Sequence, residues 1–580
     1  MLEFIQILKQ RYQAVIGQMN EREPLLTEYQ QRVEQLIYAE AFIRKGQIQE
    51  ARKHFPLQIA VIGPTQAGKS SVVNLLLGDE IAGVSPLAGY TVHPHGFCHN
   101  TAIDDCVGLQ NYFGRFQQLA EQQLSNSRYD CYSLAHTAAS SALLPDCVLW
   151  DTPDFDSIDS ADYKEGVIRT IALADIVVLV VSKEKYADQS VWEIMATIES
   201  FHQPTLICLN KLIEGSEQFI VPSLKEKWLQ VRRDAFPDVV PLFFNKQTGA
   251  PLWPESAGAM FSGLVKKVAP TKHALYQQQL LSKYWQSWLE PVYAERQASE
   301  NWRAMVDRSL ANAVKEYQRD YLDHPHHYLT FQTALLELLN LLEIPGIAKV
   351  LSKTRRVMTW PVRKLIELGK NRSLDGVSQE VSLLQQIGEH VIIQLADRLL
   401  QKAETETGDH GWWRDACNIL RKRKQLILQE YETEVRHYHA NFQQDVEATA
   451  HRLYNKLLEQ PMTLNALRAT RITTDATAMA LAIKTGGIGV HDLLLTPAML
   501  SVTSLLAESA IGSYMNKLEA ELKQHQLETV TALLFEDTLK QALYRLPEHL
   551  AGHKRFNISP EQLQQAEQYL KEKKHGLRIL

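Results

Sequence analysis

The chain has 580 residues, which is too long for a single hydrophobic core and predicts about three or four domains. Its 45% hydrophobic and 22% charged residues are typical of a soluble globular protein. The 61 basic and 67 acidic residues leave a net charge of −6, which excludes a general attraction to nucleic acid or to anionic lipid. Any binding of that kind must come from a local patch.

The cysteines and the N-terminal segment predict a cytoplasmic protein. The cysteines include no CxxC pair, and two of them, Cys147 and Cys208, fall in apolar runs typical of buried strands. We therefore expect reduced thiols. The first residues, MLEFIQILKQRYQ, carry charges within their apolar segment and lack a small-residue cleavage site, so they do not resemble a signal peptide.

Hydrophobic periodicity divides the chain into three predicted regions. Residues 1–55 have apolar side chains at helical spacing and predict two helices. Residues 56–270 alternate short apolar runs with amphipathic stretches, which predicts an α/β domain with a mostly parallel sheet. Residues 271–580 predict an all-α bundle or stalk. The apolar runs of the middle region are 57–62, 92–98, 146–150, 174–182, 205–209 and 239–244.

The middle region begins with the stretch LQIAVIGPTQAGKSS, from Leu57 to Ser71. It joins a predicted buried strand to a predicted helix at 71–77 through a G-x-x-x-x-G-K-S loop. The two glycines, Gly63 and Gly68, allow backbone N–H groups and the helix N-terminus to point at phosphates. A glycine-rich turn before an ordinary helix is the alternative. The match and its flanks favour a nucleotide-phosphate site.

Three side chains are expected to act on the phosphates and their metal ion. Lys69 places a positive charge near the β- and γ-phosphates, and Ser70 offers a hydroxyl ligand for magnesium. The apolar run CVLWD ends in Asp151, whose carboxylate should hold the same metal ion through water. Between these elements lies the loop VSPLAGYT, whose Thr91 is placed to close on the metal and the γ-phosphate.

Four motifs in order, GPTQAGKSS, VSPLAGYT, WDTPD and LNK, resemble those of the translation-factor-related P-loop GTPases, in particular the Era-like and dynamin-like branches. The AGKSS ending is more similar to dynamins, and the resemblance covers Leu57 to Lys266. It implies GTP or GDP as ligand, Mg²⁺ as cofactor, and Lys69, Ser70, Thr91 and Asp151 as the catalytic residues, with Ser70, Thr91 and Asp151 around the metal. The nucleotide contacts that it implies are Gly63, Gln66, Ala67, Gly68, Lys69, Ser70, Ser71, Asp154, Asn210, Lys211 and Asn245.

Three departures from the family pattern affect the expected activity. The DxxG motif ends in Asp154 instead of glycine, although Asp154 keeps the N–H group. Phe155 stands where Ras-like enzymes carry a catalytic glutamine, so we expect slow hydrolysis unless a partner or self-assembly completes the site. The guanine motif reads NKLI, with Ile213 in place of aspartate and Glu214 one position late. We therefore expect a weakened preference for guanine.

A histidine-rich run, TVHPHGFCH at 91–99, suggests either a metal site or a strand. Its spacing matches no usual zinc pattern, and strand alternation places His93, His95 and His99 on one face. We favour the strand.

Two segments of the helical region suggest contact with a membrane. Residues 344–372 carry eight basic residues and one acidic residue with apolar residues at helical intervals, which is typical of a basic amphipathic segment on an anionic surface. A bundle helix with a solvated basic face is the alternative. Residues 476–515 predict an apolar helical hairpin, either buried in the bundle or exposed as a tip that dips into lipid. Its longest uncharged run, 493–507, is too short to span a bilayer.

These features together predict a dynamin-like GTPase that hydrolyses GTP with Mg²⁺ and couples hydrolysis to helical rearrangement or self-assembly at a membrane surface. We expect self-association or a paired GTPase, no binding to DNA, and a peripheral location on the inner face of a membrane. The alternative is a soluble Era-like regulatory GTPase whose helical region binds a protein or RNA partner.

Overall fold

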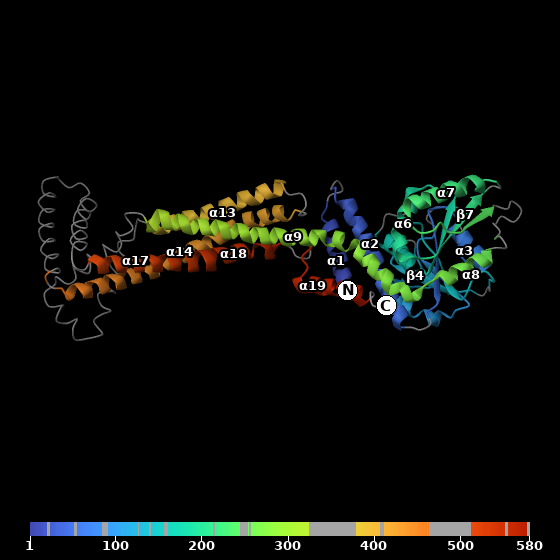
Figure 1. Cartoon of the computed structure of the whole chain (residues 1–580), viewed down its shortest axis with the longest axis horizontal. Coiled ribbons are helices and arrows are strands. Elements are labelled where there is room, and N and C mark those ends of the chain that lie inside the picture. The colour runs from blue at the N-terminus through green and yellow to red at the C-terminus, as the bar shows by residue number, and fades with distance from the viewer. Residues whose placement is uncertain are drawn as a thin grey trace. The chain divides into compact units, whose positions relative to one another are not determined.

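The structure is a computed structural model of the whole chain, which folds as two compact units, Met1–Tyr293 with His553–Leu580 and Ala294–Gly552 (Figure 1). The basic segment 344–372, most of the hairpin at 476–515, and Asn245, Ile213 and Glu214 lie outside the described residues. The structure describes residues 1–580 apart from 20–23, 52–54, 84–90, 126, 138–140, 156–160, 213–214, 244–252, 254–256, 324–378, 406–410, 461, 463–511, 551–554 and 577–580.

The first unit contains an eight-stranded sheet in the order β3-β4-β2-β5-β1-β6-β7-β8. Neighbouring strands are parallel except for β2 and β5. This arrangement confirms the predicted α/β fold with a mostly parallel sheet. The strands are β1 Leu57–Ile62, β2 His95–His99, β3 Gln117–Gln118, β4 Cys131–His136, β5 Cys147–Asp151, β6 Ile176–Ser182, β7 Thr205–Leu212 and β8 Val239–Phe243.

The central strands are buried because both faces of the sheet are covered. β5 and β6 consist of fully buried residues, and β1 becomes buried from Gln58 onward, as expected for parallel strands between two layers of helices. β1 is flanked by β5 on one side and by β6 on the other. Later strands therefore lie on both sides of β1, and the strand order reverses at its carboxyl end. Crevices at such reversal points bind ligands in open α/β sheets. The loop after β1 begins at this point.

Helices cover the sheet and extend from it. One core cluster joins a face of the sheet to α1, α2, the start of α9 and α19, and another joins the opposite face to α3 and α8. The N-terminal helices are fixed by specific contacts, such as the hydrogen bond of 2.9 Å from the Tyr12 hydroxyl to the carbonyl of Trp288. The longer helices of this unit are α1 Leu2–Ile16, α2 Leu26–Ala51, α3 Lys69–Leu77, α5 Ala161–Leu173, α6 Gln189–Ile198, α7 Glu217–Val231, α8 Ala257–Lys267 and α19 Pro560–Gly576, with α9 His273–Tyr317 beginning here.

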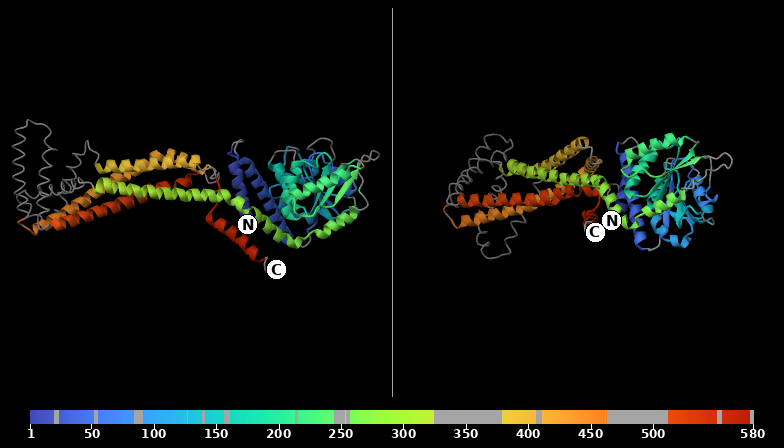
Figure 2. Two further views of the ribbon diagram at one scale, coloured as in Figure 1. Left: turned by 45° about the horizontal axis from the view of Figure 1, so that its top comes forward. Right: turned by 45° about the vertical axis from the view of Figure 1, so that its right-hand side comes forward.

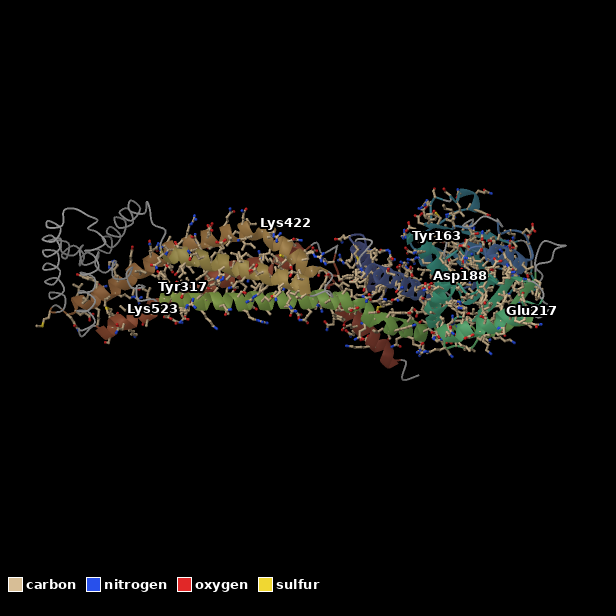
Figure 3. The ribbon with its side chains drawn as sticks, turned by 90° about the horizontal axis from the view of Figure 1, so that it is seen from above. Tyr163, Asp188, Glu217, Tyr317, Lys422 and Lys523 are labelled. Atoms are coloured by element: carbon tan, nitrogen blue, oxygen red, sulfur yellow. The ribbon has the colours of Figure 1, made fainter. Side chains whose placement is uncertain are left out.

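The second unit is a helical bundle, and in both views of Figure 2 its helices α9, α13 and α14 run side by side. Close packing is visible at Gly388 of α13, where an added Cβ would lie 2.3 Å from the ring of Tyr431 on α14. Lys422, in the basic run at 421–424, lies on the outside of α14 (Figure 3). The helices of the unit are the rest of α9, α13 Gln379–Thr405, α14 Trp412–Leu458, α17 Gly512–Thr529 and α18 Gln541–Tyr544, with π-helical segments at Gln318–Leu322 and Val530–Lys540.

Among the described residues, no helix is both long enough and apolar enough to cross a membrane.

Candidate nucleotide-binding site

The loop between β1 and α3 has a backbone that only glycine can supply at two positions. At Gly63 an added Cβ would lie 2.2 Å from the carbonyl oxygen of Val180. Gly68 has φ of 91°, and its Cβ would lie 2.4 Å from Nδ2 of Asn210. Gln66 also has a positive φ, of 62°. The loop therefore turns tightly against β6 and β7 before α3 begins.

The N-terminus of α3 faces this loop and is suited to bind an anion. Gly68 caps the helix without a side-chain hydrogen bond. The first N–H groups of a helix have no partner within the helix, and they attract negative charge. The N-terminus of α3 can therefore donate to phosphate oxygens, as the motif predicted.

Three oxygen-bearing side chains from separate parts of the chain meet beside this helix. Ser70 Oγ donates a hydrogen bond of 2.7 Å to Asp151 Oδ2 and lies 3.4 Å from Thr91 Oγ1. Asp151 ends β5, and the pairing of β5 with β1 places it opposite Val61. Its second oxygen, Oδ1, is buried without a hydrogen-bond partner. An unpartnered buried carboxylate oxygen beside two hydroxyl groups is a donor set that fits Mg²⁺.

The electrostatic environment of Asp151 also favours a cation. Burial raises the pKa of Asp151 to about 6, although the hydrogen bond from Ser70 and the charge of Lys69 act in the opposite direction. A divalent cation bound at Asp151 would stabilise the ionised carboxylate and lower this pKa.

Lys69 has a partner that sequence reasoning did not identify. Its ammonium forms a buried ion pair with Asp154 and donates a hydrogen bond of 3.3 Å to the carbonyl of Pro64. The sequence predicted only a backbone role for Asp154. A phosphate at Lys69 competes with this carboxylate for the ammonium group. The Tyr163 hydroxyl on α5 donates to the carbonyl of Asp154 at 2.6 Å, which ties the segment to α5.

The NK motif contacts the phosphate loop itself. Asn210 Nδ2 donates to the carbonyl of Ala67 at 3.0 Å, and Lys211 Nζ donates to the carbonyl of Gln66 at 2.7 Å. The end of β7 therefore holds the loop at two consecutive carbonyl groups. The contacts of Asn210 and Lys211 with a nucleotide base remain predictions. Ser71, which was also predicted to contact the nucleotide, is half-buried on α3.

The histidine-rich run at 91–99 contains the whole of β2 and the four residues before it, and its histidine rings bond to protein groups. A ring nitrogen of His93 lies 2.5 Å from the carbonyl of Arg128, and His95 lies 2.8 Å from the hydroxyl of Ser133. His99 contacts the carbonyl of Pro145 at 3.1 Å. Within the part of the chain that the structure describes, no cluster of three or more metal-binding His, Cys, Asp or Glu side chains occurs.

The fold and this geometry define a P-loop nucleotide-binding domain. The sequence profile of the 50S ribosome-binding GTPase family matches residues 58–211, which contain the loop, Thr91, Asp151 and the NK motif. Residues 58–211 therefore form a P-loop GTPase domain, and the predicted class is confirmed.

Comparison with whole proteins adds two solved structures of low similarity. One, described as an oligomerised bacterial dynamin pair that provides a mechanism for long-range sensing and tethering of membranes, aligns over 98% of this chain and 95% of its own, with 12% identity and a TM-score of 0.36. The other, the LeoA bacterial dynamin GTPase from ETEC, aligns over 94% of this chain and 97% of its own, with 11% identity and a TM-score of 0.24. No curated protein matches the chain.

Proposed function

We propose that this protein is a dynamin-like GTPase, which binds and hydrolyses GTP with Mg²⁺ and couples hydrolysis to rearrangement of its helices or to self-assembly at a membrane surface. The observation that carries the nucleotide part is the convergence of Ser70, Thr91 and Asp151 beside the phosphate loop, with one carboxylate oxygen of Asp151 left without a partner. This geometry supports the roles that we propose for the individual residues.

In this proposal the chain's own groups bind and orient the nucleotide. The N-terminus of α3 and the loop N–H groups hold the phosphates, and Lys69 supplies a positive charge. Ser70, Thr91 and Asp151 would hold Mg²⁺, which when bound neutralises charge that develops on the phosphates. Phe155 is partly buried against the core and has no group that can orient water. Hydrolysis should therefore be slow until assembly or a partner supplies that group.

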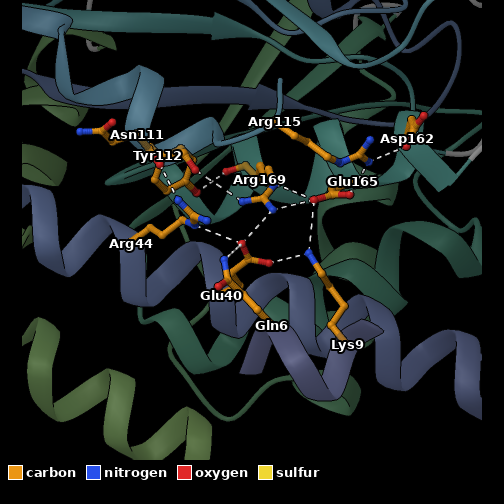
Figure 4. Close-up of polar contacts among 10 residues, drawn as sticks. All are labelled: Gln6, Lys9, Glu40, Arg44, Asn111, Tyr112, Arg115, Asp162, Glu165 and Arg169. Carbon is orange, nitrogen blue, oxygen red and sulfur yellow. Dashed lines mark hydrogen bonds and ion pairs between the residues drawn. The ribbon is translucent and has the colours of Figure 1, made fainter. Parts of the chain in front are cut away.

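A buried charge network supports coupling of the nucleotide site to the N-terminal helices. Figure 4 shows Arg169 and Glu165 of α5 facing Glu40 of α2 and Lys9 of α1. Arg169 Nη2 lies 2.6 Å from Glu165 and 3.3 Å from Glu40, and Lys9 Nζ lies 2.6 Å from Glu40. Burial alone would raise the pKa of Glu40, but the charges of Arg169 and Lys9 lower it to about 2. The carboxylate is thus held ionised within the core.

The ion pairs of this network connect α5 to α1 and α2. α5 begins a few residues after Asp154 and is tied to it through Tyr163. If nucleotide state moves the Asp151–Asp154 segment, α5 moves with it. A shift of α5 relative to α1 and α2 would separate buried charges, which costs several kcal/mol. We therefore infer that the helices follow α5.

The base preference of the site follows from the altered guanine motif. A carboxylate can accept two hydrogen bonds from guanine, whereas adenine does not offer these donors. In this chain the motif's aspartate is replaced, and only the displaced Glu214 can supply such a carboxylate. We expect GTP to bind more tightly than ATP, with a smaller ratio than a complete motif gives. Titration of both nucleotides against the wild type and Glu214→Ala tests this, and the variant should lose most of the remaining preference. Tighter binding of ATP by the wild type would contradict a GTPase assignment.

The membrane part of the proposal comes from the sequence of residues 344–372. We propose a functional division into a helical segment at 1–55, a GTPase domain at 56–270 and a helical region at 271–580 that carries this basic segment and the hairpin at 476–515. The protein would be cytoplasmic and peripheral on the inner face of a membrane, where it would associate with itself or with a paired GTPase.

A second candidate function is an Era-like regulatory GTPase whose helical region binds a protein or RNA partner. The match of residues 58–211 to a family described as 50S ribosome-binding favours this candidate. Sedimentation with ribosomal particles in the presence of GTP, and none with anionic vesicles, would support it over the membrane proposal.

A further inference from the structure

The second unit contains a groove between α9 and α13 that the proposed GTPase function does not use. Its volume is about 780 Å³, within the range of small-molecule sites. On α9 the lining residues at 301, 305, 308, 312 and 315 recur every three or four positions, so they form one face of the helix. The lining consists of Asn301, Met305, Arg308, Ala311, Asn312 and Lys315 from α9, and Arg398, Gln401, Lys402 and Thr405 from α13.

The lining is strongly positive. Four of its ten residues are basic, namely Arg308, Lys315, Arg398 and Lys402, and none is acidic. Four other residues carry amide or hydroxyl groups that can donate hydrogen bonds, at positions 301, 312, 401 and 405. The groove therefore presents donors and positive charge on both of its walls.

Three of the four cations of the groove, Arg308, Lys315 and Arg398, keep their charge available, whereas Lys402 lies over the ring of Trp413. Arg398 donates a hydrogen bond of 3.3 Å to the hydroxyl of Ser309, which is 1% exposed, so its guanidinium is anchored across the two helices. Among the described residues, Arg308, Lys315 and Arg398 form no ion pair within 4.0 Å. Two neighbouring acids on α9 have other partners: Asp307 pairs with Lys540 at 3.2 Å, and Glu316 lies 3.8 Å from His390.

We propose that this groove binds a small, multiply phosphorylated anion, either free polyphosphate or the phosphorylated headgroup of a lipid. Phosphate oxygens can accept hydrogen bonds from the cations and the side-chain amides of the lining, and arginine binds phosphate with two parallel donors.

Other ligand classes fit the lining less well. Its apolar residues are Met305 and Ala311, so a protein partner would find none of the aromatic anchors that dominate protein interfaces. It also has no aromatic ring on which a nucleic acid base could stack.

The test is calorimetric titration of the full chain with tripolyphosphate, in the presence of excess GDP so that the phosphate loop is already filled. The groove variant carries Arg308→Gln, Lys315→Gln, Arg398→Gln and Lys402→Gln. The control removes four exposed cations of the same unit that lie off the groove, through Arg414→Gln, Arg421→Gln, Lys422→Gln and Arg545→Gln. A double variant, Arg308→Gln with Lys315→Gln, changes only exposed side chains and guards against misfolding of the quadruple variant.

We expect the wild type and the control to bind tripolyphosphate equally, and the groove variant to bind at least about tenfold more weakly, since loss of one charged hydrogen bond already has that effect. The double variant should fall between them. Absence of binding by the wild type, or equal losses in the groove and control variants, would overturn the proposal.

A parallel experiment identifies the source of the phosphate. Vesicles that contain lipids with multiply phosphorylated inositol headgroups are compared with vesicles of equal charge that contain only phosphatidylserine. Groove-dependent binding of the first kind alone identifies a headgroup, and tripolyphosphate binding without vesicle binding identifies a free anion. Binding of an acidic helical peptide or RNA without any binding of tripolyphosphate would contradict the inference.

Discussion

The two carboxylates of the DTPD segment have different surroundings at the phosphate loop. Asp151 contacts Ser70, whereas Asp154 pairs with Lys69. Both contacts join residues more than 80 positions apart. Motif spacing singled out Ser70, Thr91 and Asp151, whose side chains lie together in the structure, and their roles in binding stay predictions. It could not predict the pair between Asp154 and Lys69, because this contact depends on how β5 and α3 pack.

At the residue scale, we predict that Lys69→Ala or Ser70→Asn abolishes productive binding of magnesium-nucleotide. We expect both variants to keep the fold, although Lys69→Ala leaves the Asp154 carboxylate without its partner and should also lower stability. In the proposed site, both changes remove groups that would contact the phosphates or the metal ion. Equilibrium binding of a labelled nucleotide with and without Mg²⁺ measures the effect. Ser262→Asn, at an exposed position of α8, is the matched control. Unchanged affinity and turnover in the folded Ser70→Asn protein would rule out the proposed metal site.

At the scale of elements, the apolar runs of the sequence predicted most strands of the sheet. The runs at 57–62 and 205–209 begin at the residues where β1 and β7 begin. β4 was not predicted, because its sequence CYSLAH lacks the apolar run of a strand buried on both faces. β2 begins at His95 and not at residue 92. The network between α2 and α5 was also missed, although Glu40 within an otherwise apolar helical stretch was a signal.

The network makes Arg169 a sensitive position. Arg169→Met leaves Glu40 and Glu165 buried without their guanidinium, and we expect a loss on the order of 3 to 5 kcal/mol in the local stability of α2 and α5. Arg128→Met, which breaks an exposed pair with Asp130, should cost less than about 1 kcal/mol. Native-state hydrogen exchange measures both. Similar exchange in the two variants would mean that the network does not hold α2 on α5.

A second buried carboxylate organises the bundle. Glu380, at the start of α13, accepts hydrogen bonds from the Tyr317 and Tyr438 hydroxyls at 2.7 and 3.0 Å and from Gln526 at 2.8 Å. His439 lies 3.0 Å from its other oxygen. Burial alone would raise the pKa of Glu380, but the hydrogen bonds from His439 and Tyr317 outweigh it, so the pKa is lowered. The group therefore joins α9, α13, α14 and α17.

The lowered pKa fixes the sign of a pH effect. A carboxyl group with a lower pKa in the folded state stabilises the fold fully above its unfolded pKa, near 4.3, and loses this contribution as pH falls through the folded value. We expect hydrogen exchange in α13 to accelerate below about pH 4.5 in the wild type. In Glu380→Gln, the amides of α13 should exchange faster at neutral pH, because the free energy of opening falls by about 1 to 3 kcal/mol. The exchange rate of this variant should also change less as the pH is lowered. Identical acid profiles would contradict this assignment.

At the scale of the whole molecule, a net charge of −6 does not prevent binding to an anionic surface. Each basic residue near such a surface contributes about 1 kcal/mol, so a few of the eight in 344–372 are sufficient. Charges more than about 8 Å away are screened at physiological salt, so acidic residues elsewhere barely oppose the attraction. The sequence predicted this segment from its composition, and its docking on lipid stays a prediction.

Coupling between GTP hydrolysis and the membrane is the central claim, and turnover of GTP with and without anionic vesicles tests it most directly. The membrane variant replaces Lys353, Arg355, Arg356, Arg363 and Lys364 with glutamine. The control replaces the basic run at 421–424 on α14, whose side chains are exposed or half-buried, in the same way. Nucleotide binding is measured in each variant, so that a defect in the phosphate loop is separated from a loss of membrane contact.

We predict that anionic vesicles, and not neutral ones, accelerate hydrolysis by the wild type and by the control, and that high salt removes the effect. The membrane variant should bind GTP normally and show no acceleration. Equal turnover by the wild type with and without anionic vesicles would contradict the membrane-coupled account.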